Sequence, residues 1–140
     1  MNSCVIYDLL QNSFSEYVHS DIYPSALLYS VDQISRTLNR WLLLYEQNEA
    51  IACVQWEASD GVYTFSHMAV HPSHRRLGAG GRLVRMVEEK ARSQGAILGL
   101  IAVRMSLYQN VSFVESLGYE YDSVFDEAGI YGLFKKVLEE

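Results

Sequence analysis

The sequence has few cysteines and prolines, no excess of positive charge and no long apolar run. Only two cysteines, Cys4 and Cys53, occur among the 140 residues, so we expect neither a disulfide framework nor a metal site. The net charge of −6 argues against a nucleic-acid-binding surface. The apolar runs are too short to cross a bilayer, and the start of the chain does not resemble a secretory signal. These absences predict a cytoplasmic protein that binds no nucleic acid, membrane or metal.

What remains is the composition of one ordinary globular domain, which we expect to span residues 1–140. Hydrophobic residues make up 49% of the chain and charged residues 20%, close to the average of soluble domains. A chain of this length buries most of its apolar surface on folding, so we expect it to be stable without disulfide bonds.

Apolar periodicity predicts an α/β (α+β) domain with a mixed, mostly antiparallel sheet and helices on both of its faces. Helices are expected over residues 5–18, 30–38, 80–94 and 107–117, and strands over residues 41–45, 50–57, 62–70, 96–103, 119–125 and 131–137. Ser59-Asp60-Gly61 is typical of a hairpin turn. The unbroken apolar run from Ala96 to Val103 is typical of a strand buried on both faces.

The most specific segment is a glycine-rich turn between a strand and the clearest helix. Gly78, Gly80 and Gly81 follow Arg75 and Arg76 and stand where the helix begins. The first turn of a helix carries unpaired N–H groups and the positive end of the helix dipole. Glycines let a phosphate approach this turn closely, and arginines can pair with its oxygens. The turn therefore predicts a phosphate site, although glycines can also serve only a tight connection.

Two other phosphate-binding motifs do not match this turn. A Walker loop needs a Gly-Lys-Ser/Thr sequence, which is absent. A dinucleotide fingerprint needs the spacing Gly-x-Gly-x-x-Gly, whereas the glycines here stand at positions 78, 80 and 81.

Arg75-x-x-Gly78-x-Gly80, together with three further segments, resembles the GNAT superfamily of N-acetyltransferases. The preceding Met68-Ala-Val70 resembles the end of that family's fourth strand, and the segment from Asn110 to Tyr119 is similar to its Asn-x-x-Phe-Tyr-x-x-Leu-Gly-Phe element. The final stretch from Ile130 to Leu138 resembles its closing strand. The resemblance covers about residues 30–138. It implies a GNAT-like fold, acetyl-CoA as co-substrate and no metal.

The resemblance also implies which residues hold the cofactor. The pyrophosphate would lie on the main chain of the turn, and the pantetheine arm along the fourth strand. The implied cofactor-binding residues are Met68, Ala69, Val70, Arg75, Arg76, Leu77, Gly78, Ala79, Gly80, Gly81 and Asn110.

The catalytic residues are harder to assign, because the family's usual acidic tyrosine corresponds to Val114 here. Tyr108, on the same expected helix, is the candidate acid. Glu57, His67 and Ser66 are the candidate bases or water-positioning residues. The resemblance places the family's base at the positions of Thr64 and Ser66. In a regular strand His67 and Glu57 would lie on the opposite face, and a bulge would reverse this. A histidine with only a structural role is the alternative for His67.

The acceptor side is expected near the N-terminal helices and the last hairpin, with Tyr17, Tyr23, Tyr29, Asp126 and Glu127. An acidic rim suits a cationic amine of a small molecule or peptide. Family members usually open with a strand, whereas this chain runs almost directly into a helix. Either an N-terminal edge strand is missing, or the chain is a shortened member of the family, or a partner supplies the edge. An open sheet edge favours a homodimer.

Three functions follow as hypotheses. The first is an acetyl-CoA-dependent N-acetyltransferase that moves an acetyl group to a primary amine by direct attack in a ternary complex. The second is a non-catalytic acyl-CoA-binding or regulatory module of the same fold, which the valine at position 114 favours. The third is a partner-binding domain that uses the glycine turn only structurally.

Overall fold

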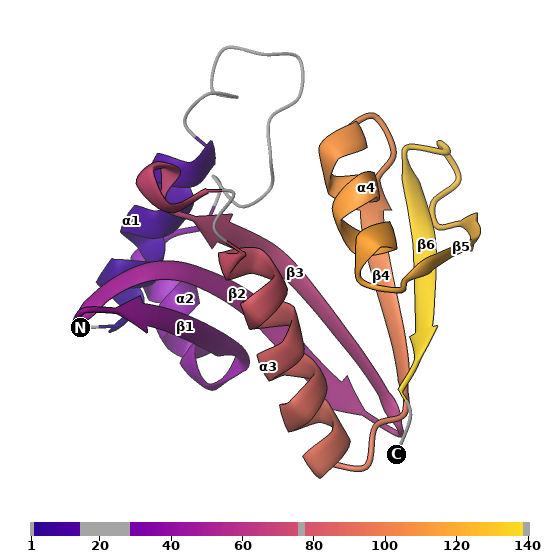
Figure 1. Cartoon of the computed structure of the whole chain (residues 1–140), viewed down its shortest axis with the longest axis horizontal. Coiled ribbons are helices and arrows are strands. Elements are labelled where there is room, and N and C mark those ends of the chain that lie inside the picture. Colours follow the sequence, from indigo (N-terminus) through magenta and orange to yellow (C-terminus); the bar gives the residue numbers. More distant parts are fainter. Residues whose placement is uncertain (1, 15–28, 76–77, 139–140) are drawn as a thin grey trace. The chain divides into compact units, whose positions relative to one another are not determined.

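A computed structural model of the chain describes residues 2–14, 29–75 and 78–138. Two helices come first along the chain, three strands follow, and then helices and strands alternate as far as two final strands (Figure 1). The helices are α1 (Asn2–Phe14), α2 (Val31–Arg36), α3 (Ala79–Ser93) and α4 (Tyr108–Ser116), with short 3-10 turns η3 (Leu38–Arg40) and η4 (Pro72–His74). The strands are β1 (Trp41–Glu46), β2 (Glu49–Ser59), β3 (Val62–Val70), β4 (Leu98–Arg104), β5 (Glu120–Val124) and β6 (Tyr131–Val137).

These elements agree with the expected ones to within a few residues, except that the part of the first helix expected beyond residue 14 lies outside the described residues. The six strands form one sheet in the order β1-β2-β3-β4-β6-β5. The pairs β1–β2, β4–β6 and β5–β6 are antiparallel and β3–β4 is parallel. The expected mixed, mostly antiparallel sheet is therefore confirmed. No helix among the described residues is long and apolar enough to cross a membrane.

Local sequence explains the sharp turns of the first three strands. Gln47 and Asn48 join β1 to β2, and Asp60 and Gly61 join β2 to β3; all four have positive φ, between 50° and 82°. Two consecutive residues of this kind form the turn whose twist matches antiparallel strands. The Asp60-Gly61 turn was predicted from the sequence, and it is confirmed.

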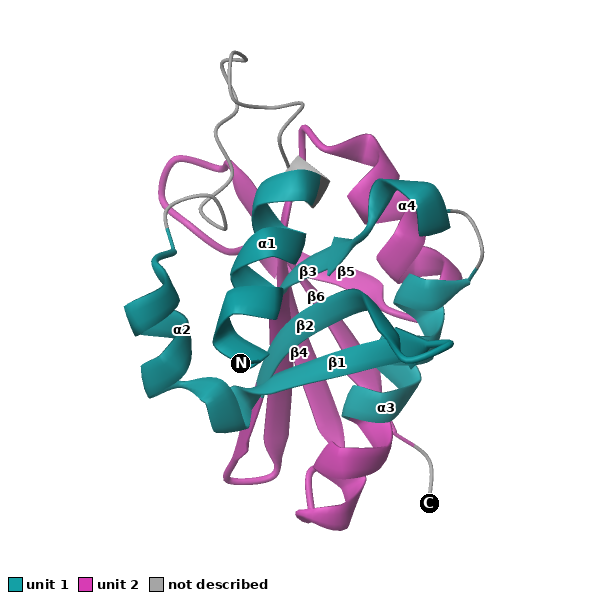
Figure 2. Cartoon of the chain, turned by 90° about the vertical axis from the view of Figure 1, so that its left-hand side faces the viewer, with its two compact units in different colours: residues 1–56, 67–87 teal, residues 57–66, 88–140 magenta. Residues whose placement is uncertain are grey.

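The described residues form two compact units, coloured separately in Figure 2. Unit 1 comprises residues 1–56 and 67–87, and unit 2 comprises residues 57–66 and 88–140. In unit 1 the apolar faces of α1 and α2 pack on β1 and β2 in one core. Its buried members are Ile6, Leu9, Leu10, Ile34, Trp41, Cys53 and Ala69.

Helix α2 has only six residues and depends on its N-cap. The Ser30 side chain accepts a hydrogen bond from the Gln33 main-chain nitrogen, and the Gln33 side chain accepts one from the Ser30 nitrogen. This reciprocal capping box satisfies two N–H groups that the helix itself leaves unpaired. The Ile34 side chain of this helix is buried in the core of unit 1.

In unit 2, β4 pairs with β6 along its whole length, from Leu98–Val137 to Arg104–Tyr131. Its register with β3 covers only Val62–Leu98 and Tyr63–Gly99. The expectation that this strand is buried on both faces is wrong. Gly99, Ile101 and Val103 are buried, Ala102 is exposed, and Leu98, Leu100 and Arg104 are half-buried. An apolar run shows that both faces of a strand are hydrophobic, but tertiary packing decides how much of each face is buried.

Candidate cofactor site and the bulged strand beside it

Strand β3 ends in a turn that its own histidine stabilises. The His71 N–H donates to the Ile51 carbonyl over 2.8 Å, the last strand-like bond of this segment. The His71 Nδ1 then accepts the Ser73 N–H over 3.2 Å and caps the η4 turn that begins at Pro72. His71 therefore ends the strand, and the chain turns toward α3.

The helix α3 begins directly after a glycine in the left-handed region. Gly78 has a φ of 80°, which L residues with a side chain rarely adopt. The first bond within the helix runs from the Arg82 nitrogen to the Gly78 oxygen over 3.1 Å. The N–H groups of Ala79, Gly80 and Gly81 precede this bond, so they have no acceptor within the helix. Such a terminus can bind an anion through its main chain and its dipole.

Positive side chains stand near this terminus in the sequence. Arg75, Arg82 and Arg85 are exposed, and His74 is half-buried. Arg76 and Leu77, which the sequence assigns to the same site, lie outside the described residues. The turn therefore combines N–H donors and arginines, which are the groups that phosphate oxygens prefer.

Strand β3 contains one residue more than a regular hairpin allows. Ser59 and Val62 flank the two-residue turn, so a regular hairpin would place Ile51 opposite Val70; the structure instead bonds Ile51 to His71. His67 has a φ of 53° in the middle of the strand. One extra residue with such a φ is a β-bulge.

The bulge breaks the alternation of side chains along β3. Before it, the Phe65 ring meets the Tyr119 ring in unit 2, at 5.7 Å between centroids. After it, Ala69 packs in the core of unit 1. Strand β3 is therefore not regular at His67, so the expectation drawn from a regular strand does not hold for that residue.

The bulge brings His67 together with two residues that sequence reasoning did not connect with it. The His67 Nδ1 lies 2.9 Å from the Gln55 Oε1, and the Tyr29 hydroxyl donates to the same oxygen over 3.1 Å. The rings of Tyr29 and His67 are 4.8 Å apart between centroids. Burial lowers the pKa of His67 from its usual value. The positions are far apart in sequence, so only the pairing of the strands could reveal this cluster.

The other residues expected along β3 differ in exposure. Met68 and Val70 are half-buried, and Ala69 is buried. The Cys53 thiol, on β2, makes a hydrogen bond with the main chain of Ala69, and burial raises the pKa of that thiol to about 12. Cys53 is thus a buried member of the core of unit 1.

The remaining catalytic candidates belong to unit 2. Glu57 on β2 and Ser66 on β3 are exposed. Tyr108, the first residue of α4, is 79% exposed, and Val114, at the position of the family's tyrosine, is 4% exposed. Asn110 is exposed in the first turn of α4. Because the Tyr108 side chain is largely exposed, its role as an acid stays a prediction.

The acidic rim expected on the last hairpin is partly engaged in the turn itself. The Asp126 carboxylate accepts the Tyr131 N–H over 2.9 Å, and Glu127 is exposed. Tyr17 and Tyr23 lie outside the described residues. Tyr29 belongs to the cluster around His67.

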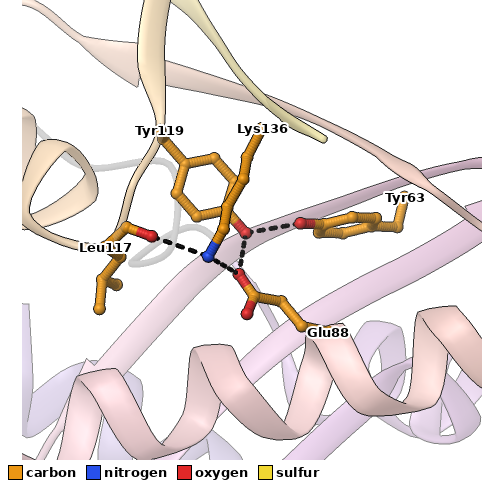
Figure 3. A network of polar contacts seen from close by, with 5 residues as sticks. All are labelled: Tyr63, Glu88, Leu117, Tyr119 and Lys136. Atoms are coloured by element: carbon orange, nitrogen blue, oxygen red, sulfur yellow. Dashed lines mark hydrogen bonds and ion pairs between the residues drawn. The ribbon is translucent and has the colours of Figure 1, made fainter. Parts of the chain in front are cut away.

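A second polar cluster is buried within unit 2 (Figure 3). The Tyr119 hydroxyl donates to the Glu88 carboxylate over 2.7 Å, and the Tyr63 hydroxyl lies 2.8 Å from the Tyr119 oxygen. The Lys136 ammonium donates to Glu88 over 2.9 Å and to the Leu117 carbonyl over 2.8 Å. Since the Tyr119 proton is donated to Glu88, Tyr63 is the donor between the two phenols.

The electrostatics of this cluster keep both phenols protonated. Burial raises the pKa of Tyr63 to about 12. Burial and the hydrogen bonds to Tyr63 and Glu88 raise the pKa of Tyr119 as well. The cluster joins α3 to β6 and to the end of α4, so we interpret it as a structural network.

Comparison with solved structures shows the type of fold. The chain superposes on PaiA N-acetyltransferase from Thermoplasma acidophilum, solved with coenzyme A, with a TM-score of 0.83 at 12% identity over 97% of this chain and 92% of that one. For the ribosomal-protein-S18-alanine N-acetyltransferase from Escherichia coli the TM-score is 0.71 at 19% identity over 98% and 86%. N-acetylglutamate synthase from Neisseria gonorrhoeae, solved with coenzyme A and N-acetyl-glutamate, gives 0.74 at 14% identity over 94% of this chain and 32% of that one.

The fold is thus that of the N-acetyltransferases. The model of the Acetyltransferase (GNAT) family matches residues 5–119, and the chain belongs to that family. No curated protein matches the sequence.

Proposed function

We propose that this protein is an acetyl-CoA-dependent N-acetyltransferase that transfers an acetyl group to a primary amine of a small molecule or peptide. The observation that carries the proposal is the start of α3. There the N–H groups of Ala79, Gly80 and Gly81 precede the first bond of the helix, directly after the left-handed Gly78. In a chain of the GNAT family, this terminus is the proposed pyrophosphate site.

In the proposed complex the cofactor lies along two segments of the chain. Its pyrophosphate accepts hydrogen bonds from residues 76–81, and Arg75 and Arg76 add positive charge. Its pantetheine arm bonds the main chain of Met68, Ala69 and Val70. Asn110 is proposed to contact the same arm.

The reaction is proposed to proceed by direct attack within a ternary complex. The amine nitrogen attacks the thioester carbonyl, and main-chain N–H groups of β3 stabilise the oxyanion that develops. Binding both substrates together makes the attack effectively unimolecular, which by itself supplies a large share of the rate.

Calorimetry with coenzyme A tests the cofactor site. We expect Gly80→Glu to abolish binding, because it places a carboxylate where the phosphates should lie. Gln94→Glu is the matched control, since it adds the same charge at an exposed position beyond the other end of α3, and it should bind like the wild type. Equal binding by wild type and Gly80→Glu would refute the proposed site.

A thiol-release assay tests the transfer. Acetyl-CoA is offered with spermidine, lysine, glucosamine and a short peptide with a free α-amino group. Amine-dependent release of coenzyme A thiol is the expected result. Tight binding without release for any amine would instead favour the non-catalytic module, to which the buried Val114 also points.

A homodimer and a cytoplasmic location complete the proposal. Strand β1 stands at one edge of the sheet, and an edge strand can pair with another copy. Sedimentation velocity over a range of protein concentrations measures this directly, and a monomer at all concentrations would exclude the dimer.

A further inference from the structure

His67 combines a backbone conformation that is unusual in a strand with defined contacts to polar side chains. Four residues other than glycine have positive φ in the described chain, and three of them, Gln47, Asn48 and Asp60, form the two hairpin turns. The fourth is His67, in the interior of β3. A non-glycine residue held in this region within a strand points to a functional constraint.

The surroundings of His67 fix which of its ring nitrogens carries the proton. The Gln55 Oε1 is only an acceptor, and it accepts the Tyr29 hydroxyl over 3.1 Å. The His67 Nδ1, 2.9 Å from the same oxygen, must then be the donor. In a neutral imidazole the lone pair is therefore on Nε2.

The same surroundings keep the ring neutral and its orientation defined. Burial lowers the pKa of His67, so the ring is neutral at pH 7. The ring packs against the phenol of Tyr29, from the segment before α2, at 4.8 Å between centroids. From β2 it faces the neutral amide of Gln55, while the Cys53 thiol bonds the main chain of Ala69. A neutral, oriented imidazole is the state that a general base needs.

The position of His67 along the chain suits the proposed chemistry. It comes directly before Met68, where the proposed pantetheine segment begins. Its ring faces Tyr29, which belongs to the proposed acceptor side. His67 therefore lies next to the proposed pantetheine segment and faces a residue of the expected acceptor side. A base that takes up the amine proton is needed at such a position.

We propose that His67 is the general base of the acetyl transfer, and that Gln55 and Tyr29 are positioning residues that hold its Nε2 as the proton acceptor. This inference rests on the proposed function. As the amine nitrogen bonds to the thioester carbon, its proton passes to the His67 Nε2. The C–S bond then breaks with its electron pair on sulfur, and the thiolate takes a proton from His67 or from water. The products are the amide and the free thiol of coenzyme A.

The first experiment measures the ring itself and needs no acceptor. Long-range proton–nitrogen NMR of imidazole at pH 7.5 should show His67 protonated on Nδ1. Gln55→Glu should raise the pKa of His67, because a carboxylate stabilises the imidazolium. A ring protonated on Nε2, or a pKa unchanged in Gln55→Glu, would overturn the proposal.

The second experiment measures turnover with acetyl-CoA and the amine of the panel that reacts fastest. His67→Asn keeps a donor toward Gln55 but removes the base, so kcat should fall at least about 100-fold with unchanged affinity for coenzyme A. His71→Asn is the matched control, since asparagine also caps a turn, and it should keep kcat. A His67→Asn variant within threefold of the wild-type kcat would rule out the base.

The pH profile separates a base from a structural histidine. The pKa of His67 lies below 6.5, the ordinary value for histidine, so the ring becomes protonated only below pH 6.5. We therefore expect the fall of kcat on the acid side of the pH profile to lie below pH 6.5. Gln55→Glu should move this limb to higher pH, whereas a structural histidine would leave it in place. If coenzyme A fails to bind the wild type, the proposed function fails, while the NMR result still decides the state of His67.

Discussion

At the scale of single residues, glycines of this protein serve different physical needs. Gly78 provides a φ of 80°, and an added Cβ would meet no atom within 4 Å. Gly99 has ordinary φ but no room, because an added Cβ would lie 2.5 Å from the Tyr63 Oη and 2.9 Å from its Cε1. Gly78 is required by its backbone conformation, whereas Gly99 is required because the buried Tyr63 ring leaves no room for a side chain.

Gly99→Ala should therefore destabilise the protein by about 2 kcal/mol, the usual cost of overpacking a core. Tyr63 is 1% exposed and bonded to Tyr119, so its ring has little freedom to move away. Urea denaturation measures the free energy of unfolding. In a Tyr63→Val background, where the ring is absent, the same substitution should cost much less, and an equal cost in both backgrounds would contradict the steric explanation.

At the scale of elements, one lysine links three segments of unit 2. Lys136 on β6 bonds Glu88 on α3 and the carbonyl of Leu117 at the end of α4 (Figure 3). The side chains of Lys136 and Glu88 are 26% and 11% exposed. Breaking a buried ion pair on one side leaves a charge without compensation.

Lys136→Met should lower the free energy of unfolding by about 3 kcal/mol. The substitution leaves the Glu88 carboxylate without its positive partner and the Leu117 carbonyl without its hydrogen-bond donor. The double variant Glu88→Met, Lys136→Met should lose less than Lys136→Met alone, since both charges are then removed. Chemical denaturation of the wild type, of Glu88→Met, of Lys136→Met and of the double variant gives the coupling energy between the two side chains. A double variant less stable than Lys136→Met would show that the carboxylate is not the source of the penalty.

At the scale of the whole molecule, the net charge and the proposed ligand have the same sign. The chain carries −6, and coenzyme A is an anion. Affinity must then come from local donors at the start of α3 and not from the overall field of the protein. We therefore expect the diphosphate to be the part of the cofactor on which binding depends.

Coenzyme A at about 100 times its Kd should stabilise the folded protein by about 2.7 kcal/mol. For a chain of this size, that corresponds to a rise in Tm on the order of 8 °C. Dephospho-coenzyme A, which keeps the diphosphate, should retain most of the rise, and pantetheine, which lacks it, should give none. Scanning calorimetry measures all three, and a full rise with pantetheine would contradict a diphosphate-based site.

The sequence by itself determined the order of elements, the hairpin turn and the helix that follows the glycine turn. These features depend on local preferences: hydrophobic periodicity, positive φ at Asp60-Gly61, and the start of a helix after Gly78. Its motifs also indicated the family, which the match over residues 5–119 shows. The single domain and the cofactor residues stay predictions.

Tertiary structure alone decided what surrounds His67 and how β4 is covered. The extra residue in β3 is visible only when the bond between His71 and Ile51 sets the register. Tyr29 and Gln55 stand 38 and 12 residues before His67, and only strand pairing and packing bring them to one ring. Local preferences act between neighbours in the chain, whereas a bulge and a polar cluster arise from contacts between segments that are distant in sequence.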